Sequence, residues 1–263
     1  MSKGKVLLVG SNATRIEIQG GGTGPTGQYL NETVVPALAM VDAGYDVVLV
    51  TPNGTKPYID PASDSAQHFG GDENAYRRAR TFFDSIKDVR TLRSALEEGL
   101  DNYIGVFVPG GQAPVVDLMQ DVELGEILRH FHARRKPTAL LCHGPIASLA
   151  ALPDPKGYRA ALIAGDKAKA AQLAKGWQYA GYKMTVFTAS EETPIEENIL
   201  HGKLYFTMPD ALEGAGGEVS RSAVDFDPHV VEDRELITGQ NPRSDHPLAA
   251  KLVAALNRAV VAA

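Results

Sequence analysis

The amino-acid sequence predicts an α/β fold in which a mostly parallel, doubly wound sheet is covered by helices on both faces. Short apolar runs of strand length occur at residues 5–9, 46–51, 103–109 and 138–141. Amphipathic stretches of helix length alternate with them at residues 31–43, 74–86, 122–134 and 145–152. This alternation is typical of βαβ units, whose parallel sheets are buried on both faces.

The pattern is looser after residue 152. We expect further strands at residues 158–164 and 184–188, and near Val224, Val230 and Leu236. A helix is expected to begin after Thr193, because Pro194 suits a first helical position and Glu196 completes a capping box. A last helix is expected at residues 247–261. No repeat and no shift in composition marks a boundary, so we expect one domain over residues 1–263.

Composition and charge restrict the class of protein. With 44% hydrophobic and 22% charged residues, the chain of 263 residues can form one large core. Its net charge of −6 offers no positive field for nucleic acid or for an anionic membrane, and we expect Arg77, Arg78 and Arg80 to form a solvated helix face. We see no export signal, no apolar run of membrane-spanning length and no second cysteine for a disulfide, so we expect a cytoplasmic protein.

Two patterns resemble ligand-binding motifs, but the sequence around them does not fit a ligand-binding site. Gly22, Gly24 and Gly27 form a G-x-G-x-x-G, as in dinucleotide-binding proteins. The motif lies well beyond the end of its preceding strand, and no acidic residue follows the next strand to hold a ribose, so we expect a flexible loop. His130 and His132 are two apart on an expected helix and point to different faces, which argues against a shared metal ion. We expect neither a nucleotide nor a metal cofactor.

The segment that carries the chemistry is residues 138–152, where an apolar strand ends at Cys142 and a helix begins almost at once. Pro145 suits the first turn of that helix. A thiol on such a turn lies near the positive end of the helix dipole and is exposed by the turn. We therefore expect Cys142 to be a nucleophile with a lowered pKa, and the adjacent His143 to be its proton acceptor.

A lone free cysteine is more often a small buried apolar side chain than a nucleophile, so the hypothesis depends on its neighbours. A second strand, at residues 104–108, ends in Pro109, Gly110 and Gly111. Glycines at the end of a strand let backbone amides face an anion, as an oxyanion hole requires. These neighbours favour the chemical interpretation of Cys142.

These two segments resemble the ThiJ/PfpI superfamily, whose fold is the flavodoxin-like fold of class I glutamine amidotransferases. The resemblance rests first on Cys142-His143-Gly144-Pro145 after a strand, with Pro109-Gly110-Gly111 before it. More specific matches resemble the branch that contains heat-shock chaperones and glutathione-independent glyoxalases, called glyoxalase III. They cover nearly the whole chain, at residues 26–32, 43–46, 51–54, 59–63, 191–192 and 236–242.

The resemblance implies roles for four side chains. Cys142 would be the nucleophile and His143 its base, with Glu192 as the acid that orients the imidazole. Glu32 would be a second acid, which in its protonated form can donate a hydrogen bond to the thiolate. From the residues alone, Glu32 could equally favour a helix dipole and Glu192 could lie in a solvated loop.

The resemblance also implies an oxyanion hole and a substrate pocket. The backbone amides of Gly111 and His143 would hold the oxyanion, and Gly110 and Gln112 would line the pocket. Many relatives carry histidine where this chain has Gln112. Glutamine cannot take a proton near neutral pH, so this departure implies a weakened or redirected activity. We interpret Asp117 and the turn at residues 238–242 as structural.

The leading functional hypothesis is the cofactor-free conversion of a small 2-oxoaldehyde, such as methylglyoxal, to a 2-hydroxy acid. A second enzyme hypothesis is hydrolysis of an amide or hydration of an isonitrile by the same thiol. A holdase chaperone, which needs an exposed apolar patch, and a redox sensor, which oxidises its cysteine, are hypotheses from other classes. Glutamine amidotransfer is not expected, because the C-terminal half contains no His-x-Glu. The resemblance further implies a homodimer.

Overall fold

A seven-stranded sheet forms the centre of the protein in the order β10-β11-β7-β6-β1-β4-β5, which confirms the predicted α/β class. We describe residues 2–262 from a computed structural model. Six of these strands run parallel and the edge strand β10 is antiparallel to β11. The strands are β1 (Lys5–Val9), β4 (Asp46–Thr51), β5 (Arg90–Thr91), β6 (Tyr103–Val108), β7 (Thr138–Leu141), β10 (Val230–Asp233) and β11 (Leu236–Gly239).

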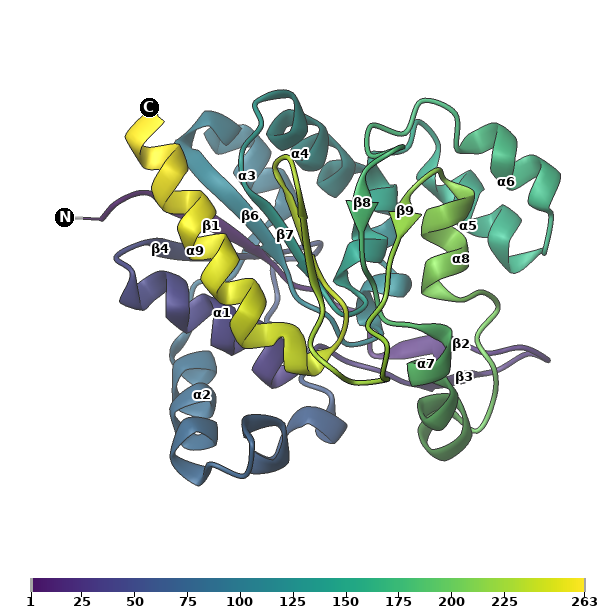
Figure 1. Cartoon of the computed structure of the whole chain (residues 1–263), viewed down its shortest axis with the longest axis horizontal. Coiled ribbons are helices and arrows are strands. Elements are labelled where there is room, and N and C mark those ends of the chain that lie inside the picture. Colours follow the sequence, from purple (N-terminus) through teal and green to yellow (C-terminus); the bar gives the residue numbers. More distant parts are fainter. Residues whose placement is uncertain (1, 263) are drawn as a thin grey trace.

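Helices cover both faces of this sheet (Figure 1). One face carries α1 (Leu30–Asp42) and α9 (Asp245–Ala262). The other carries α3 (Leu92–Glu98), α4 (Val122–Ala133) and the 3-10 helix η6 (Gly144–Ala151). Alternate strand residues supply the two cores: in β1, Val6 and Leu8 face α1 and α9, whereas Leu7 and Val9 belong to the opposite core. A strand buried on both faces is for this reason a continuous apolar run in the sequence.

Smaller elements surround the central layers. A two-stranded hairpin forms from β2 and β3, and a second small sheet from β8 and β9. The peripheral helices and strands are β2 (Arg15–Glu17), β3 (Thr23–Pro25), α2 (Glu73–Ser85), α5 (Pro155–Ile163), α6 (Lys167–Leu173), β8 (Lys183–Met184), α7 (Ala189–Ile195), α8 (Met208–Gly214) and β9 (Glu218–Val219). Short 3-10 segments lie at Pro61–Ser63, Ala66–Phe69, Leu100–Asn102, Ala113–Val115, Leu118–Gln120 and Pro242–Ser244, and a π turn at Glu196–Leu200.

The expected strand at residues 158–164 is wrong, because this segment belongs to helix α5. Asp154 caps the helix with its side chain, and Pro155 occupies its first turn. Tyr158 and Ala161 are buried one helical turn apart, which is the helical period that the sequence reading took for a strand. The glycine-rich segment expected as a flexible loop is also partly wrong: residues 23–25 form β3 of the hairpin.

The expected start of the helix near residue 193 is wrong by five residues. Helix α7 is capped by Thr188, whose side chain and that of Glu191 form the capping box. Two Thr-x-x-Glu patterns follow each other here, at residues 188–191 and 193–196, and the structure uses the first, which places Pro194 inside the helix just before the π turn. Of the expected strand at residues 184–188 only Met184 pairs in a sheet, as the end of β8, and Val224 lies outside any strand.

Helix α1 contains Pro36 four residues after Glu32. Proline has no N–H, so the carbonyl of Glu32 lacks its usual helical donor, and the proline ring crowds it. The first turn of α1 is held from outside the helix instead. The Leu30 amide donates to Ser63 Oγ at 3.0 Å, and Asn31 Nδ2 donates to the Pro242 carbonyl at 3.1 Å.

The surface agrees with the expected charge pattern on α2. Arg78 contacts Asp42 and Arg80 contacts Asp64 and Asp84, while Arg77 bonds Asn74, so this arginine cluster is an exposed helix face. Within residues 2–262, no helix combines the length and the apolar character that a membrane crossing requires.

The helical assignment of α5 can be tested at its cap. Asp154→Ala removes the side-chain oxygen that accepts from the Gly157 amide, and we expect a loss of about 1 kcal/mol in the free energy of unfolding. Asp88→Ala, at an exposed residue outside helices and strands, serves as control. Urea denaturation measures both; equal stability of the two variants would contradict the cap.

Candidate active site

The carboxyl ends of β6 and β7 bring the predicted site residues to one edge of the sheet. Strand β6 leads into Gly110 and Gly111, and β7 leads directly into Cys142. Strand order changes direction at β1, beside β6, and crevices at such points are the usual ligand sites of doubly wound sheets.

Cys142 adopts a left-handed backbone conformation with φ of 62°. A residue with a β-carbon adopts this conformation at a cost of about 1–2 kcal/mol, so its surroundings must hold it there. The Cys142 amide donates to the Gly239 carbonyl at 2.8 Å, and the Cys142 carbonyl accepts from the Phe187 amide at 3.0 Å. The turn from β7 into η6 is thereby fixed by β11 on one side and by the segment before α7 on the other.

Cys142, His143 and Glu192 form one hydrogen-bonded chain. His143 Nδ1 lies 3.4 Å from Cys142 Sγ, and His143 Nε2 lies 2.7 Å from Glu192 Oε2. A carboxylate only accepts, so Nε2 carries the proton and Nδ1 of the neutral ring presents its lone pair to the thiol. The Phe187 ring lies against the imidazole, with 4.5 Å between ring centroids. The imidazole is therefore oriented to accept the thiol proton.

Gln112 bonds the same carboxylate from its other side. Its Nε2 donates to Glu192 Oε1 at 2.5 Å, in a buried contact. Glu192, buried on helix α7 rather than in a solvated loop, thus has one donor on each oxygen. We expected Gln112 to contact substrate; it lines the pocket and also holds the acid that orients His143.

Glu32 approaches Cys142 from behind the turn. It is fully buried in the first turn of α1, and neither of its oxygens has a well-formed hydrogen bond, although the thiol and the Gly110 and Gly111 amides lie close. Gly110 is wedged between Glu32 and Cys142, where a β-carbon would collide with both. Gly110 therefore separates these groups and is absent from the pocket lining, contrary to our expectation.

The expected lowering of the Cys142 pKa is wrong. Burial raises the pKa of the thiol well above its ordinary value, and the nearby carboxyls of Glu32, Glu192 and Glu191 raise it further. The helix N-terminus is outweighed because a buried thiolate would face several negative charges. Burial likewise raises the pKa of Glu32 from 4.5 to about 8, with Asp245 adding to the effect. Glu32 consequently holds a proton at neutral pH.

Glu191 is the residue that the sequence reading missed beside Glu192. Its fully buried carboxylate accepts from the Phe226 amide at 2.7 Å and from Gln240 Nε2 and Asn241 Nδ2, each at 2.9 Å. Its second oxygen accepts from the amide and hydroxyl of Thr188. Glu191 thus ties α7 to the turn at residues 238–242, which is structural as expected. The capping-box pattern at residues 188–191 was the available signal.

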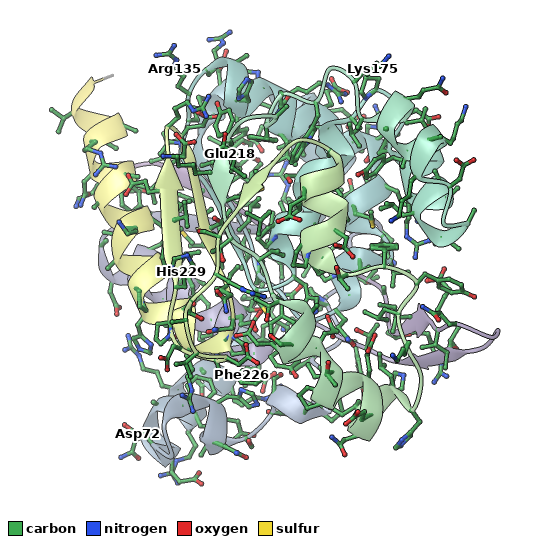
Figure 2. All side chains as sticks on the ribbon, turned by 45° about the vertical axis from the view of Figure 1, so that its right-hand side comes forward. Asp72, Arg135, Lys175, Glu218, Phe226 and His229 are labelled. Carbon is green, nitrogen blue, oxygen red and sulfur yellow. The ribbon has the colours of Figure 1, made fainter. Side chains whose placement is uncertain are left out.

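The thiol opens into a pocket of about 1010 Å³. Cys142, His143, Gly111 and Gln112 line it, with one aromatic wall from Phe187 and Phe226. Phe226 is labelled near this end of the molecule in Figure 2. Polar groups that the sequence reading did not single out complete the lining: Tyr29, Asn31, Asp60, His68, Asp225, Arg243, Asp245 and His246. They come from segments far apart in the sequence: Tyr29, Asn31 and Asp60 lie within the family-like segments at residues 26–32 and 59–63, whereas the others lie outside every motif described above.

The residues excluded from the site take other roles. His132 contacts Glu235 at 2.7 Å, and His130 contacts Asp101 at 3.1 Å. Asp117 accepts from the Ser11 hydroxyl and the Asn12 amide, which agrees with a structural interpretation. Across the described residues, no group of three or more His, Cys, Asp or Glu side chains is arranged to hold a metal ion.

Fold and site together define a class: a flavodoxin-like α/β protein with a cysteine on a strand-to-helix turn, linked through histidine to a buried acid. A model of the DJ-1/PfpI family matches residues 27–186. The chain belongs to the DJ-1/PfpI family.

Individual relatives are similar over nearly the whole chain. Protein/nucleic acid deglycase HchA of Staphylococcus aureus (strain Newman) is 26% identical over 255 residues, which cover 94% of this chain and 77% of the relative. Rapid Encystment Protein 24 kDa of Francisella tularensis matches with a TM-score of 0.68 and 20% identity, covering 96% of this chain and 99% of the other. Glyoxalase III of Candida albicans matches with a TM-score of 0.67 and 22% identity, covering 96% and 97%. The two solved structures share the fold.

Removing Glu191 should destabilise the protein strongly. Glu191→Ala leaves the Phe226 amide and the side-chain amides of Gln240 and Asn241 buried without an acceptor, and we expect a loss of at least about 3 kcal/mol. Urea unfolding measures it, with Glu197→Ala at an exposed position as control. A loss below 1 kcal/mol, about the effect of one exposed hydrogen bond, would contradict this role.

The buried proton on Glu32 should make stability depend on pH. Between pH 4.5 and about 8 the native protein keeps a proton that the unfolded chain has released, so raising the pH through this window favours unfolding. We expect wild-type stability to fall relative to Glu32→Gln by up to about 1.4 kcal/mol per pH unit. Urea titrations of both proteins and of Glu126→Gln measure it. If the free energy of unfolding of the wild type and of Glu32→Gln changed with pH in the same way, the buried proton on Glu32 would be ruled out.

Proposed function

We propose that this protein is a cysteine-dependent enzyme that converts small 2-oxoaldehydes to 2-hydroxy acids without glutathione. One observation carries the proposal: a thiol, an imidazole and a carboxylate form a single hydrogen-bonded chain beside an open pocket. The names of two relatives, a deglycase and a glyoxalase III, support carbonyl chemistry.

The first step forms a carbon–sulfur bond. The Cys142 thiol gives its proton to His143 Nδ1 while sulfur attacks the aldehyde carbon, and the resulting alkoxide takes a proton to give a hemithioacetal. Glu192 and Gln112 hold the imidazole in the required tautomer and orientation. The backbone amides of Gly111 and His143 are the proposed donors to the negative oxygen.

The second step moves hydrogen within the substrate. His143 removes the proton from the former aldehyde carbon, and the enediol that forms is reprotonated at the neighbouring carbon, which gives a thioester of the 2-hydroxy acid. Water then cleaves the thioester and restores the thiol. The aldehyde carbon is oxidised and the ketone carbon reduced within one molecule, so atoms and electrons balance with one added water.

Glu32 supplies the charge control that this cycle needs. Its raised pKa keeps the carboxyl neutral near pH 7, so a thiolate released by the thioester does not meet a further negative charge at Glu32. The neutral carboxyl can instead donate a hydrogen bond to sulfur. The high pKa of the resting thiol implies that proton transfer to His143 accompanies attack rather than preceding it.

In a second candidate function, the substrate is an adduct of a 2-oxoaldehyde with an amine rather than the free aldehyde. The pocket of about 1010 Å³ is far larger than a three-carbon substrate needs, and polar groups lie in its lining beyond the thiol. The Staphylococcus relative is named a protein/nucleic acid deglycase. Release of a 2-oxoaldehyde group from an amine would use the same thiol addition.

Loss of the thiol should abolish turnover. We expect Cys142→Ala to lose all glutathione-free methylglyoxal conversion and His143→Ala to lose about 10²–10⁴-fold in kcat. His201→Ala, at an exposed histidine, should keep wild-type rates. Chromatography of lactate measures conversion.

The same assay separates the alternatives. Wild-type enzyme without methylglyoxal turnover removes the first proposal, and turnover of a methylglyoxal–arginine adduct alone would favour the second. Amide and isonitrile substrates, added to the panel, test hydrolysis and hydration. A trapped adduct on Cys142, detected by mass spectrometry, identifies the nucleophile in each case.

A further inference from the structure

A second pocket lies at the other end of the central sheet. Its volume is about 670 Å³, and it is bordered by Pro137 just before β7 and Glu235 just before β11, at the amino ends of these strands. Figure 2 shows Arg135, which lines this pocket, far from Phe226 of the catalytic pocket. None of the proposed catalytic residues contributes to it.

Three arginines line this second pocket although the chain is acidic overall. Arg234 contacts Asp233 at 2.9 Å and Arg258 contacts Glu232 at 2.6 Å, and each guanidinium has further N–H groups available. Arg135 has no carboxylate within 4.0 Å anywhere in residues 2–262. Arg135 therefore offers its whole guanidinium to the pocket, and Arg234 and Arg258 offer the N–H groups that their ion pairs leave free.

Arg135 stands where a glycine would be the usual choice. It follows the C-cap of α4 with φ of 51°, and its amide bonds the His132 carbonyl while the next amide bonds the Phe131 carbonyl, as in a Schellman turn. An arginine is strained in this conformation, and exposed strain of this kind is often retained at functional positions. The hydrogen bonds of the turn fix the backbone of Arg135 where its side chain lines the pocket.

The single acid in the lining, Glu235, is buried and its carboxylate is hydrogen-bonded by protein groups. The Glu235 side chain is 2% exposed and accepts from His132 Nδ1 at 2.7 Å and from the Tyr182 hydroxyl at 3.1 Å. A bound anion would therefore meet the guanidinium groups and not an unpaired carboxylate.

We propose that this second pocket binds a small organic molecule through a phosphate group. Guanidinium groups form paired, charge-assisted hydrogen bonds to phosphate oxygens, and Arg135 and Arg258 offer them from two different helix ends. Apolar wall residues Pro137, Ile237 and Ala255, and a volume many times that of phosphate, leave space for an organic part. The site is independent of the carbonyl chemistry proposed for Cys142.

Calorimetry and thermal denaturation at constant ionic strength test this proposal. The probes are glucose 6-phosphate, inorganic phosphate, glucose and citrate, added to the wild-type chain. We expect saturable binding and a raised Tm with glucose 6-phosphate, weaker binding of inorganic phosphate, and no binding of glucose. Tighter binding of citrate would overturn the choice of phosphate over carboxylate.

Two variants separate binding from structure. Arg135→Gly relieves the backbone strain, so its ligand-free Tm should equal or exceed that of the wild type, whereas its affinity for glucose 6-phosphate should fall about tenfold. Arg135→Gly/Arg258→Ala should lose binding. Arg77→Ala/Arg78→Ala, with the same loss of charge on α2, should bind like the wild type, and so should Cys142→Ala.

The following outcomes would contradict phosphate binding in the second pocket. Equal affinity in Arg135→Gly and wild type would show that phosphate acts elsewhere or by general exclusion from the surface. Equal weakening in the Arg77→Ala/Arg78→Ala control would reduce the effect to net charge. Absence of saturable binding by the wild type to either phosphate probe overturns the proposal.

Discussion

The left-handed backbone of Cys142 is the constraint on which the site depends. A β-carbon makes this conformation costly, and the turn persists because a carbonyl of β11 and an amide before α7 hold both of its peptide groups. Those contacts join the sheet to the segment that carries Glu192. The contacts that hold Cys142 in its left-handed conformation thus also set the distance from His143 to Glu192.

Three buried glutamates around this turn differ in how their oxygens are satisfied. Glu191 is surrounded by donors and acts as a structural tie, and Glu192 has one donor on each oxygen and orients an imidazole. Glu32 has no well-formed hydrogen bond, and a carboxyl that burial deprives of donors keeps its proton. Environment, rather than residue type, therefore decides which acid can exchange a proton near neutral pH.

The sequence was sufficient for elements whose signals are local. Continuous apolar runs identified β1, β4, β6 and β7, and family motifs identified the residues that meet at Cys142. It was insufficient where two signals compete or where contacts are distant. The short, largely apolar run at residues 158–164 suits either a strand or a buried helix, two Thr-x-x-Glu patterns follow each other within residues 188–196, and the effect of Glu32 on the thiol requires the folded distance. Neither Glu191 nor the polar pocket lining has a local signature that names its partners.

Pro36 has a consequence for the motion of the site. Because it removes the donor to the Glu32 carbonyl, the first turn of α1 has one hydrogen bond fewer to the rest of its helix, and contacts to Ser63 and Pro242 anchor it from outside. Pro242 belongs to the pocket lining, and Ser63 follows Asp60, which also lines it. The turn that carries the buried proton is thus held partly by the loops that line the pocket. A molecule bound against those loops would therefore slow the hydrogen exchange of the backbone amides of residues 30–33 without contacting these residues.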